Sequence, residues 1–255
     1  MPHTRRSFLA GGVAAGTTLV MPFAAAAETG DAHRFDMVSG PLTVHPVRHG
    51  SVVVETPLGA IYFDPAGRAA DYAALPAPDL VLVTHQHGDH YHPDVLELIM
   101  GPDTPLVVNP AVMSLLPQTL RERASAMGNG ETAEVAGVGI QAVAAYNTTE
   151  GRRRFHPEGR DNGYVVTVGD FRTYLSGDTE DVPEMRALRD IDLAFVCMNL
   201  PSTMSAAQAA SAVAEFRPRV VYPYHYHGRD GGTQDPREFA RLVGQASDVR
   251  QAEWY

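Results

Sequence analysis

Short apolar runs, many of them rich in β-branched residues, alternate along the chain with segments of helical character. Such runs predict β-strands, and in the first half of the chain they lie at Val52–Glu55, Ile61–Phe63, Leu80–Thr84 and Leu106–Val108. In the second half the predicted strands are Gly139–Ala145, Tyr164–Val168, Arg172–Leu175, Leu193–Cys197 and Val220–Tyr222. Helices are predicted at Asp94–Met100, Ala111–Ala126, Pro183–Arg189, Ala206–Phe216 and Pro236–Gly244. Two of them begin near a proline, which is tolerated in the first turn because that N–H lacks a helical partner.

The order of these elements is similar in the two halves: strands come first, and strands alternating with helices follow. This order predicts two sheets covered by helices on their outer faces. Leu80–Thr84 is an uninterrupted apolar run, which is typical of a strand that is buried on both faces. The loop after such a strand opens at the sheet edge where α/β proteins bind ligands.

The first 27 residues have the pattern of an export signal rather than of a folded segment. Arg5 and Arg6 precede an apolar stretch from about Ala10 to Phe23, and a run of small residues ends at Ala27. The paired arginines resemble the twin-arginine type of bacterial signal. Because the apolar stretch is short and contains glycines, it falls below the ~20 residues of a spanning helix, so no stable membrane anchor is expected. We expect a periplasmic or secreted protein with one domain over residues 28–255.

Composition excludes several kinds of chemistry. The formal net charge is −10, so no basic surface for nucleic acid is expected. All 20 basic residues are arginine, which excludes a Schiff-base lysine and the lysine of a P-loop. Cys197 is the sole cysteine and lies in an apolar run, so we interpret it as a small buried residue. A metal site would therefore use histidine and carboxylate ligands.

Potential metal ligands are concentrated after the strand Leu80–Thr84. His85, His87, Asp89 and His90 fall within six residues. Histidines two apart can point the same way from an extended segment, and Gly88 is expected to allow a sharp turn before Asp89. Imidazole and carboxylate are the ligands that zinc accepts when cysteine is absent. The loop therefore predicts a metal site.

Four features in order along the chain resemble the metallo-β-lactamase superfamily. They are Asp64 at the end of an early strand, the histidine loop 85–90, the Ser-Gly-Asp-Thr turn 176–179, and a strand ending at residues 223–226. The resemblance runs from about residue 43 to 245 and is closest to the branch of ascorbate-phosphate lactonase-like and N-acyl-phosphatidylethanolamine phospholipase D-like proteins. It implies an α/β fold, the αββα sandwich of two mixed sheets, with two metals at one edge.

The resemblance also implies a set of ligands. His85 and His87 would bind the first metal, Asp89, His90 and His225 the second, and Asp178 would bridge both. The family usually supplies a third histidine to the first metal, but the strand before the Gly-Asp turn ends in Asn147. We take His156 as that ligand. Two alternatives stay open: Asn147 as a weak oxygen ligand, or a metal held by the first two histidines and Asp178 alone.

Other residues near these motifs are weaker candidates. Asp64 is expected to orient the histidine loop by hydrogen bonds, to serve as a turn residue before Pro65, or both. His92 is expected to lie outside the ligand set, and His227 to be a proton donor or a surface residue. His49 reaches the site if its early loop folds over the edge. The run Arg152–Arg154 is expected to be a solvated loop, with binding of a phosphate or carboxylate as the alternative.

The function implied by the resemblance is hydrolysis of an ester, lactone, amide or phosphodiester bond in a small molecule by a metal-bound hydroxide. Asp89 and Asp178 would be the catalytic residues, and zinc is the expected metal, with manganese or iron as alternatives. A Gly-x-Ser-x-Gly elbow is absent, in keeping with a reaction that needs no covalent intermediate. A di-iron redox protein and a non-catalytic metal-binding protein of the same fold are the alternative functions.

Overall fold

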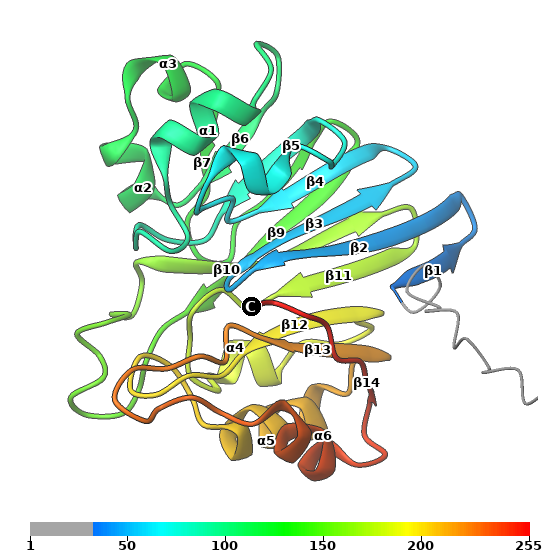
Figure 1. Ribbon diagram of the computed structural model, residues 1–255, viewed down its shortest axis with the longest axis vertical. Coiled ribbons are helices and arrows are strands. Elements are labelled where there is room, and N and C mark those ends of the chain that lie inside the picture. The colour runs from blue at the N-terminus through cyan, green and yellow to red at the C-terminus, as the bar shows by residue number, and fades with distance from the viewer. Residues whose placement is uncertain (1–32) are drawn as a thin grey trace, which may run out of the picture. The chain divides into compact units, whose positions relative to one another are not determined.

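The computed structural model describes residues 33–255, and these residues form two seven-stranded sheets that pack face to face (Figure 1). The predicted export signal at residues 1–27, with its cleavage site, lies outside the described residues. Both sheets have the same plan, in which antiparallel strands are followed by parallel ones. The predicted αββα sandwich is confirmed.

The first sheet contains strands β1 to β7 in sequence order. Strands β1 to β4 pair antiparallel, and β4 to β7 pair parallel. Their bounds are Arg34–Met37, Gly40–Arg48, Ser51–Thr56, Gly59–Phe63, Pro78–Val83, Leu106–Val108 and Ala124–Ala126.

The second sheet contains β8 to β14, again in sequence order across the sheet. Strands β8 to β11 are antiparallel, and β11 to β14 are parallel. Their bounds are Thr132–Val135, Val138–Ala145, Asp161–Val168, Phe171–Leu175, Leu193–Cys197, Val220–Tyr224 and Asp248–Val249. In each sheet the parallel strands end on loops that carry predicted ligands.

Helices cover the outer faces of the two sheets (Figure 1). On the first sheet lie the 3₁₀ helix η1 (Ala69–Tyr72), α1 (Pro93–Ile99), α2 (Pro110–Leu115) and α3 (Gln118–Arg121). On the second lie α4 (Pro183–Arg186), α5 (Ala206–Phe216) and α6 (Pro236–Val243). The predicted prolines do occupy the first turns of α4 and α6. No helix within residues 33–255 is long and apolar enough to cross a membrane.

Strand β5 is buried on both faces, as its apolar run predicts. Leu80 and Leu82 pack into the core between the sheets, whereas Val81 and Val83 pack under α1 to α3. Successive side chains of a strand point to opposite faces, so an uninterrupted apolar run serves two cores at once. This packing holds the start of the histidine loop at a rigid position.

The predicted helix Ala111–Ala126 is wrong. The segment folds as α2, α3 and the edge strand β7. Pro117 explains the interruption, because a proline disfavours helical backbone in the preceding residue and lacks an N–H itself. Leu116 accordingly has an extended ψ of 135°. Strands β1, β2, β8 and β14 were not predicted, because their runs are short or contain polar residues and proline.

Candidate metal centre

The predicted ligands come together at one edge of the sandwich, although they are distant in the sequence. The histidine loop follows β5, Asp178 follows β11 and His225 follows β13. The parallel strands of both sheets end at this edge, so the loops that follow them meet. His156 arrives from the loop between β9 and β10, and His49 from the turn between β2 and β3.

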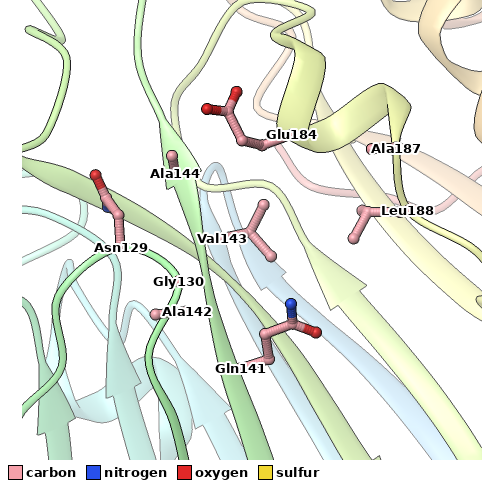
Figure 2. A pocket seen from close by; sticks show the side chains of 9 residues that line it. All are labelled: Asn129, Gly130, Gln141, Ala142, Val143, Ala144, Glu184, Ala187 and Leu188. Atoms are coloured by element: carbon pink, nitrogen blue, oxygen red, sulfur yellow. The ribbon is translucent and has the colours of Figure 1, made fainter.

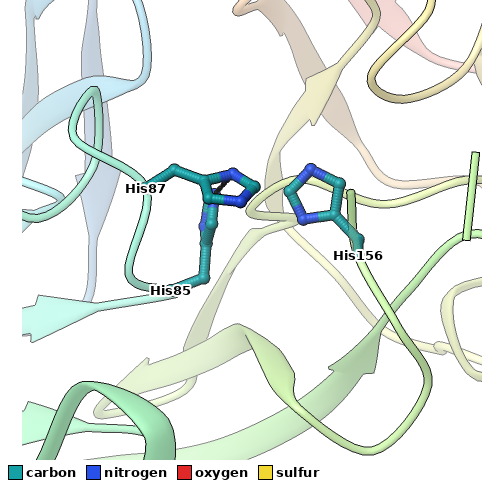
Figure 3. A group of neighbouring side chains, drawn as sticks. All are labelled: His85, His87 and His156. Atoms are coloured by element: carbon teal, nitrogen blue, oxygen red, sulfur yellow. Dashed lines mark hydrogen bonds between the residues drawn. The ribbon is translucent and has the colours of Figure 1, made fainter. Parts of the chain in front are cut away.

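One group consists of three imidazoles from two loops. His85 and His87 come from the loop after β5, and His156 faces them from the opposite loop (Figure 3). The ligand atoms of all three lie within 4.8 Å of one another. Nε2 of His85 and Nδ1 of His87 are 3.1 Å apart. Asn147 is not in this group: its amide nitrogen donates to the carbonyls of Arg152 and Ser202. The structure therefore places His156, rather than Asn147, beside the two loop histidines.

Asp178 lies at the centre of the histidines. Its Oδ1 is 3.5 Å from Nε2 of both His90 and His225, and its Oδ2 is 3.5 Å from Nε2 of His156. Two donors bonded to one tetrahedral zinc ion at about 2.0–2.1 Å lie roughly 3.4 Å apart. The separations around Asp178 thus suit a carboxylate that is shared between two cations, the role implied for it by the sequence.

Unsatisfied atoms at the centre fit a metal. Nε2 of His90, His156 and His225 and Oδ1 of Asp178 are buried, and within residues 33–255 they have no hydrogen-bond partner. Burying a polar atom without a partner costs about 1–3 kcal/mol. Two divalent cations on either side of Asp178 would satisfy these atoms, since His156 lies by Oδ2 of Asp178 and His90 and His225 lie by Oδ1. The residues present therefore fit the two metals that the fold implies.

Hydrogen bonds outside the cluster set which ring nitrogen faces it. Nδ1 of His90 contacts the carboxylate of Asp64 at 2.7 Å, and Nδ1 of His156 contacts that of Asp161 at 3.0 Å. Nδ1 of His85 lies 2.9 Å from the hydroxyl of Thr84. Because Nδ1–H donates in each case, the lone pair of Nε2 points inward, as a metal ligand requires. Asp64 therefore does orient the loop, and it also accepts the N–H and hydroxyl of Thr84.

Asp161 is the residue that sequence reasoning missed in this set. It is buried, and Arg160 pairs with its carboxylate at 2.7 and 2.8 Å. The available signal was an acidic residue five positions after His156 and three before the predicted strand Tyr164–Val168. That signal is weak, because only the folded loop shows which group the carboxylate contacts.

In the cluster, neighbouring charges and hydrogen bonds outweigh the effect of burial on the pKa of three groups. Burial alone would raise the pKa of Asp178, but His225 and His90 outweigh it and hold that pKa well below its usual value. Burial likewise opposes ionisation of Asp89, whose pKa is nevertheless lowered by hydrogen bonds from His225 and His49. Burial alone would lower the pKa of His90, but the negative charges of Asp178 and Asp64 outweigh burial and raise this pKa to about 10.

Glu180 secures the loop that carries His156. Its buried carboxylate accepts hydrogen bonds from the N–H groups of Thr148 and Thr149 at 2.8 and 2.7 Å, and from Arg152 at 2.9 Å. Arg153 donates to the carbonyl of Thr148 instead. Arg152 and Arg153 therefore stabilise the loop by hydrogen bonds within it and to Glu180. The side chain of Arg154 lies over the ring of Phe155.

The remaining candidates have distinct positions. His92 occupies the N-cap position of α1 without a capping side-chain hydrogen bond, and it belongs to none of the ligand groups. His227 is exposed and stacks on Tyr255, with ring centroids 3.5 Å apart. His49 does reach the site, with its Nε2 3.3 Å from Oδ2 of Asp89. Cys197 is fully buried, as predicted.

Two glycines near the centre differ in what they permit. A Cβ on Gly50 would lie 2.6 Å from Cε1 of His90 and 3.1 Å from Cδ2 of His225, so this position needs a glycine. A Cβ on Gly88 would meet nothing within 4 Å, and its φ is not positive. The turn expected at Gly88 is present, since the N–H of His90 donates to the carbonyl of His87 at 2.9 Å, but its ordinary backbone angles do not require a glycine.

The metal centre opens into a cavity of about 370 Å³. Its wall includes Phe155, Ser202, His227 and Arg229, besides the predicted ligands His87, Asp89, Asp178 and His225. A second hollow of about 400 Å³ lies along β9 and α4, where Val143, Leu188 and Glu184 line it (Figure 2). The three ligand groups in residues 33–255 are all outside that second hollow, so the first cavity is the candidate substrate site.

Comparison with known proteins gives matches over most of the chain. The profile of the beta-lactamase superfamily domain matches residues 43–225. A UPF0173 metal-dependent hydrolase from Pyrococcus horikoshii is 31% identical over 188 residues, which cover 72% of this chain and 81% of the relative.

Solved structures give the same result. The chain is similar to a crystal structure from Parabacteroides distasonis, provisionally described as a metal-dependent hydrolase, with 38% identity and a TM-score of 0.78 over 87% of this chain and 98% of that one. Igni18, a metallo hydrolase of Ignicoccus hospitalis, is 22% identical with a TM-score of 0.69, over 83% of this chain and 95% of that one, and shows the shared fold.

Proposed function

Because this chain belongs to the metallo-β-lactamase superfamily of metal-dependent hydrolases, we propose that it hydrolyses an ester, lactone, amide or phosphodiester bond of a small molecule with two divalent metal ions. Zinc is the proposed metal, since histidine and carboxylate are ligands that it accepts and geometry and supply select among metals. The predicted ligand set is His85, His87, Asp89, His90, His156, Asp178 and His225.

One observation carries the proposal: buried Nε2 atoms of His90, His156 and His225 converge on Asp178 without hydrogen-bond partners among the described residues. A cluster that served only stability would be expected to pair these atoms with one another or with the backbone. Leaving them unpaired in the interior suits a site that is completed by cations.

When bound, a pair of divalent cations would supply a nucleophile from water at neutral pH and would neutralise the negative charge that develops on the substrate. Asp178 holds both halves of the centre together through its two oxygens. Asp89 lines the cavity with a half-exposed carboxylate. His225 and His49 keep its pKa far below the usual value. Asp89 therefore stays ionised at neutral pH and is better suited to orient the attacking water by accepting its O–H than to retain a proton.

A covalent route through the cysteine is not supported. Cys197 is fully buried, and burial raises the pKa of its thiol to about 12. The thiolate is the reactive form, so such a thiol is inert at neutral pH. The proposed reaction accordingly consists of a direct attack by water in the cavity.

Elemental analysis together with a substrate panel tests the proposal. We expect about two zinc or manganese ions per chain and turnover of at least one ester, lactone, β-lactam or phosphodiester substrate. Asp89→Ala and Asp178→Ala should abolish turnover while the protein stays folded. Bound iron with redox activity would favour the di-iron alternative, tight metal without turnover a binding protein, and full activity of either variant would overturn the proposed roles.

We also propose that the protein is exported to the periplasm or the exterior by its twin-arginine-type signal. The support is the sequence of residues 1–27, in which Arg5 and Arg6 precede an apolar stretch. A double variant, Arg5→Lys with Arg6→Lys, should leave the full-length protein in the cytoplasmic fraction. Unchanged recovery from the periplasmic or culture fraction would refute this route.

A further inference from the structure

His49 lies in the metal centre without belonging to the ligand set implied by the family resemblance. It follows β2 directly and precedes Gly50, whose missing side chain leaves room for His90 and His225. The rings of His49 and His225 are in contact, with centroids 3.8 Å apart. The backbone N–H of His225 also donates to the carbonyl of His49 at 3.2 Å. The turn after β2 and the segment after β13 are thus joined at the site by a ring contact and a backbone hydrogen bond.

The donor atoms of His49, Asp89 and His225 form a compact group. Oδ2 of Asp89 is 3.3 Å from Nε2 of His49 and 3.4 Å from Nε2 of His225. All three atoms lie within 4.8 Å of one another. Donors of one tetrahedral zinc ion are separated by roughly 3.4 Å. His49 therefore has nearly the same spacing to Asp89 as the proposed ligand His225.

The far nitrogen of His49 is held by a residue from the other end of the described chain. Nδ1 of His49 lies 2.9 Å from the phenol oxygen of Tyr255, 206 positions away. The same oxygen accepts the backbone N–H of His227 at 3.1 Å, and the ring of Tyr255 stacks on that of His227. With a metal ion in place of the proton on Nε2, Nδ1–H of His49 can donate to this phenol oxygen, as metal-bound histidines donate to their outer partners.

Backbone conformation points the same way. His49 and His225 both have positive φ values, 44° and 48°, which are uncommon for residues with a side chain. Such conformations are strained and persist where the surrounding structure requires them, often at ligand sites. Both strained residues aim their rings at the same carboxylate.

Resting on the proposed function, we infer that His49 is an additional protein ligand of the metal ion held by Asp89 and His225, and that Tyr255 is a positioning residue for its imidazole. The cation at this position thereby gains a neutral nitrogen donor from the β2–β3 turn, and the segment around Tyr255 becomes part of the metal centre. The alternative is that His49 merely donates a hydrogen bond to Asp89.

Titration of the metal-free protein with Co²⁺ tests the inference, with the visible absorption spectrum, the Co²⁺ content per chain and the dissociation constants as readouts. His49→Ala should weaken the binding of one of the two Co²⁺ ions by more than the roughly 10–100-fold that is typical for loss of an outer partner. It should also change the absorption spectrum of that ion. Tyr255→Phe should weaken the binding of the same ion by about 10-fold but leave its spectrum unchanged. His45→Ala removes an imidazole from β2 that pairs with Glu55 and should change neither.

His49→Gln separates the two roles, since its amide nitrogen can donate to Asp89, whereas its amide oxygen is a weaker ligand that would give a different Co²⁺ spectrum. We expect it to resemble His49→Ala, with thermal unfolding confirming that each variant is folded. Wild-type affinity and spectrum in either His49 variant would overturn the inference while leaving the proposed function intact. A wild-type protein that binds no Co²⁺, Zn²⁺ or Mn²⁺ would overturn both.

Discussion

Asp64 and His90 form a buried pair in which the carboxylate oxygen Oδ2 lies 2.7 Å from the ring nitrogen Nδ1. Asp64 directly follows β4, and His90 lies 26 positions later in the loop after β5. The same carboxylate accepts the N–H of Thr84. One side chain therefore joins two neighbouring strand ends and selects the tautomer in which Nε2 of His90 faces the metal centre.

Gly50→Ala should disturb the metal centre through contact alone. Its new Cβ would approach Cε1 of His90 to 2.6 Å, so that ring or the backbone must move. We expect loss of at least one bound metal and a decrease of about 1–3 kcal/mol in the free energy of unfolding. Metal analysis and urea unfolding measure the two effects.

Gly88→Ala is the matched control, because Gly88 lies in the histidine loop but a Cβ there has open space around it. This variant should retain its metal and its stability. Equal metal loss in both variants would contradict the contact argument, because a Cβ at Gly88 meets nothing within 4 Å.

Asp161→Asn should weaken binding of the metal that His156 holds, without removing a ligand. The substitution keeps the shape of the side chain but removes the charge that favours Nδ1–H donation from His156. We expect an affinity loss on the order of 10-fold for one metal. Competition with a chelator measures it, and Asp248→Asn, an exposed acidic residue of β14, is the control. Equal affinities in the wild type and Asp161→Asn would exclude the proposed orienting role.

Metal affinity should rise with pH well beyond neutrality. In the absence of metal, Asp178 and Asp64 overcome the effect of burial and raise the pKa of His90 to about 10. A cation must displace this proton, so the apparent dissociation constant should fall about tenfold per pH unit for each proton released. Chelator competition between pH 6 and 8.5 measures the slope. A plateau above pH 7, as expected for a histidine with a pKa of about 6.5, would contradict it.

Glu180→Gln should loosen the loop that carries His156. Burial opposes ionisation of Glu180, but hydrogen bonds from Thr149 and Thr148 prevail and lower its pKa. At neutral pH we expect a loss of about 1–3 kcal/mol in the free energy of unfolding, because N–H donors and Arg152 lose a charged acceptor. Urea unfolding measures the loss.

The pH dependence of that loss identifies its cause. A carboxylate with a lowered pKa contributes its stability above the pKa of the unfolded state, about 4.3, and this contribution disappears as the pH falls through the folded-state value. The difference between wild type and Glu180→Gln should therefore shrink below pH 4. A constant difference between pH 7 and 3.5 would attribute the effect to shape rather than to charge.

Local patterns determined much of the fold. The apolar runs of β3 to β6 and β9 to β13 are recognisable because buried strands need such residues wherever they lie in the chain. Prediction from weak or interrupted runs was wrong. The proline-containing strand β2 was not predicted, and Ala111–Ala126 was predicted as one helix although Pro117 divides it. Edge strands such as β7 depend on pairing with a neighbour, which a short run does not encode.

The sequence by itself determined the donor types, their order and the strand after which the histidine loop begins, since these are properties of adjacent residues. Only the tertiary structure decided that His156 rather than Asn147 lies beside His85, that Asp161 orients His156, and that Tyr255 contacts His49. These contacts arise where strand pairing brings loop ends together. Their specificity lies in distances between side chains far apart in the chain, and no local pattern carries that information.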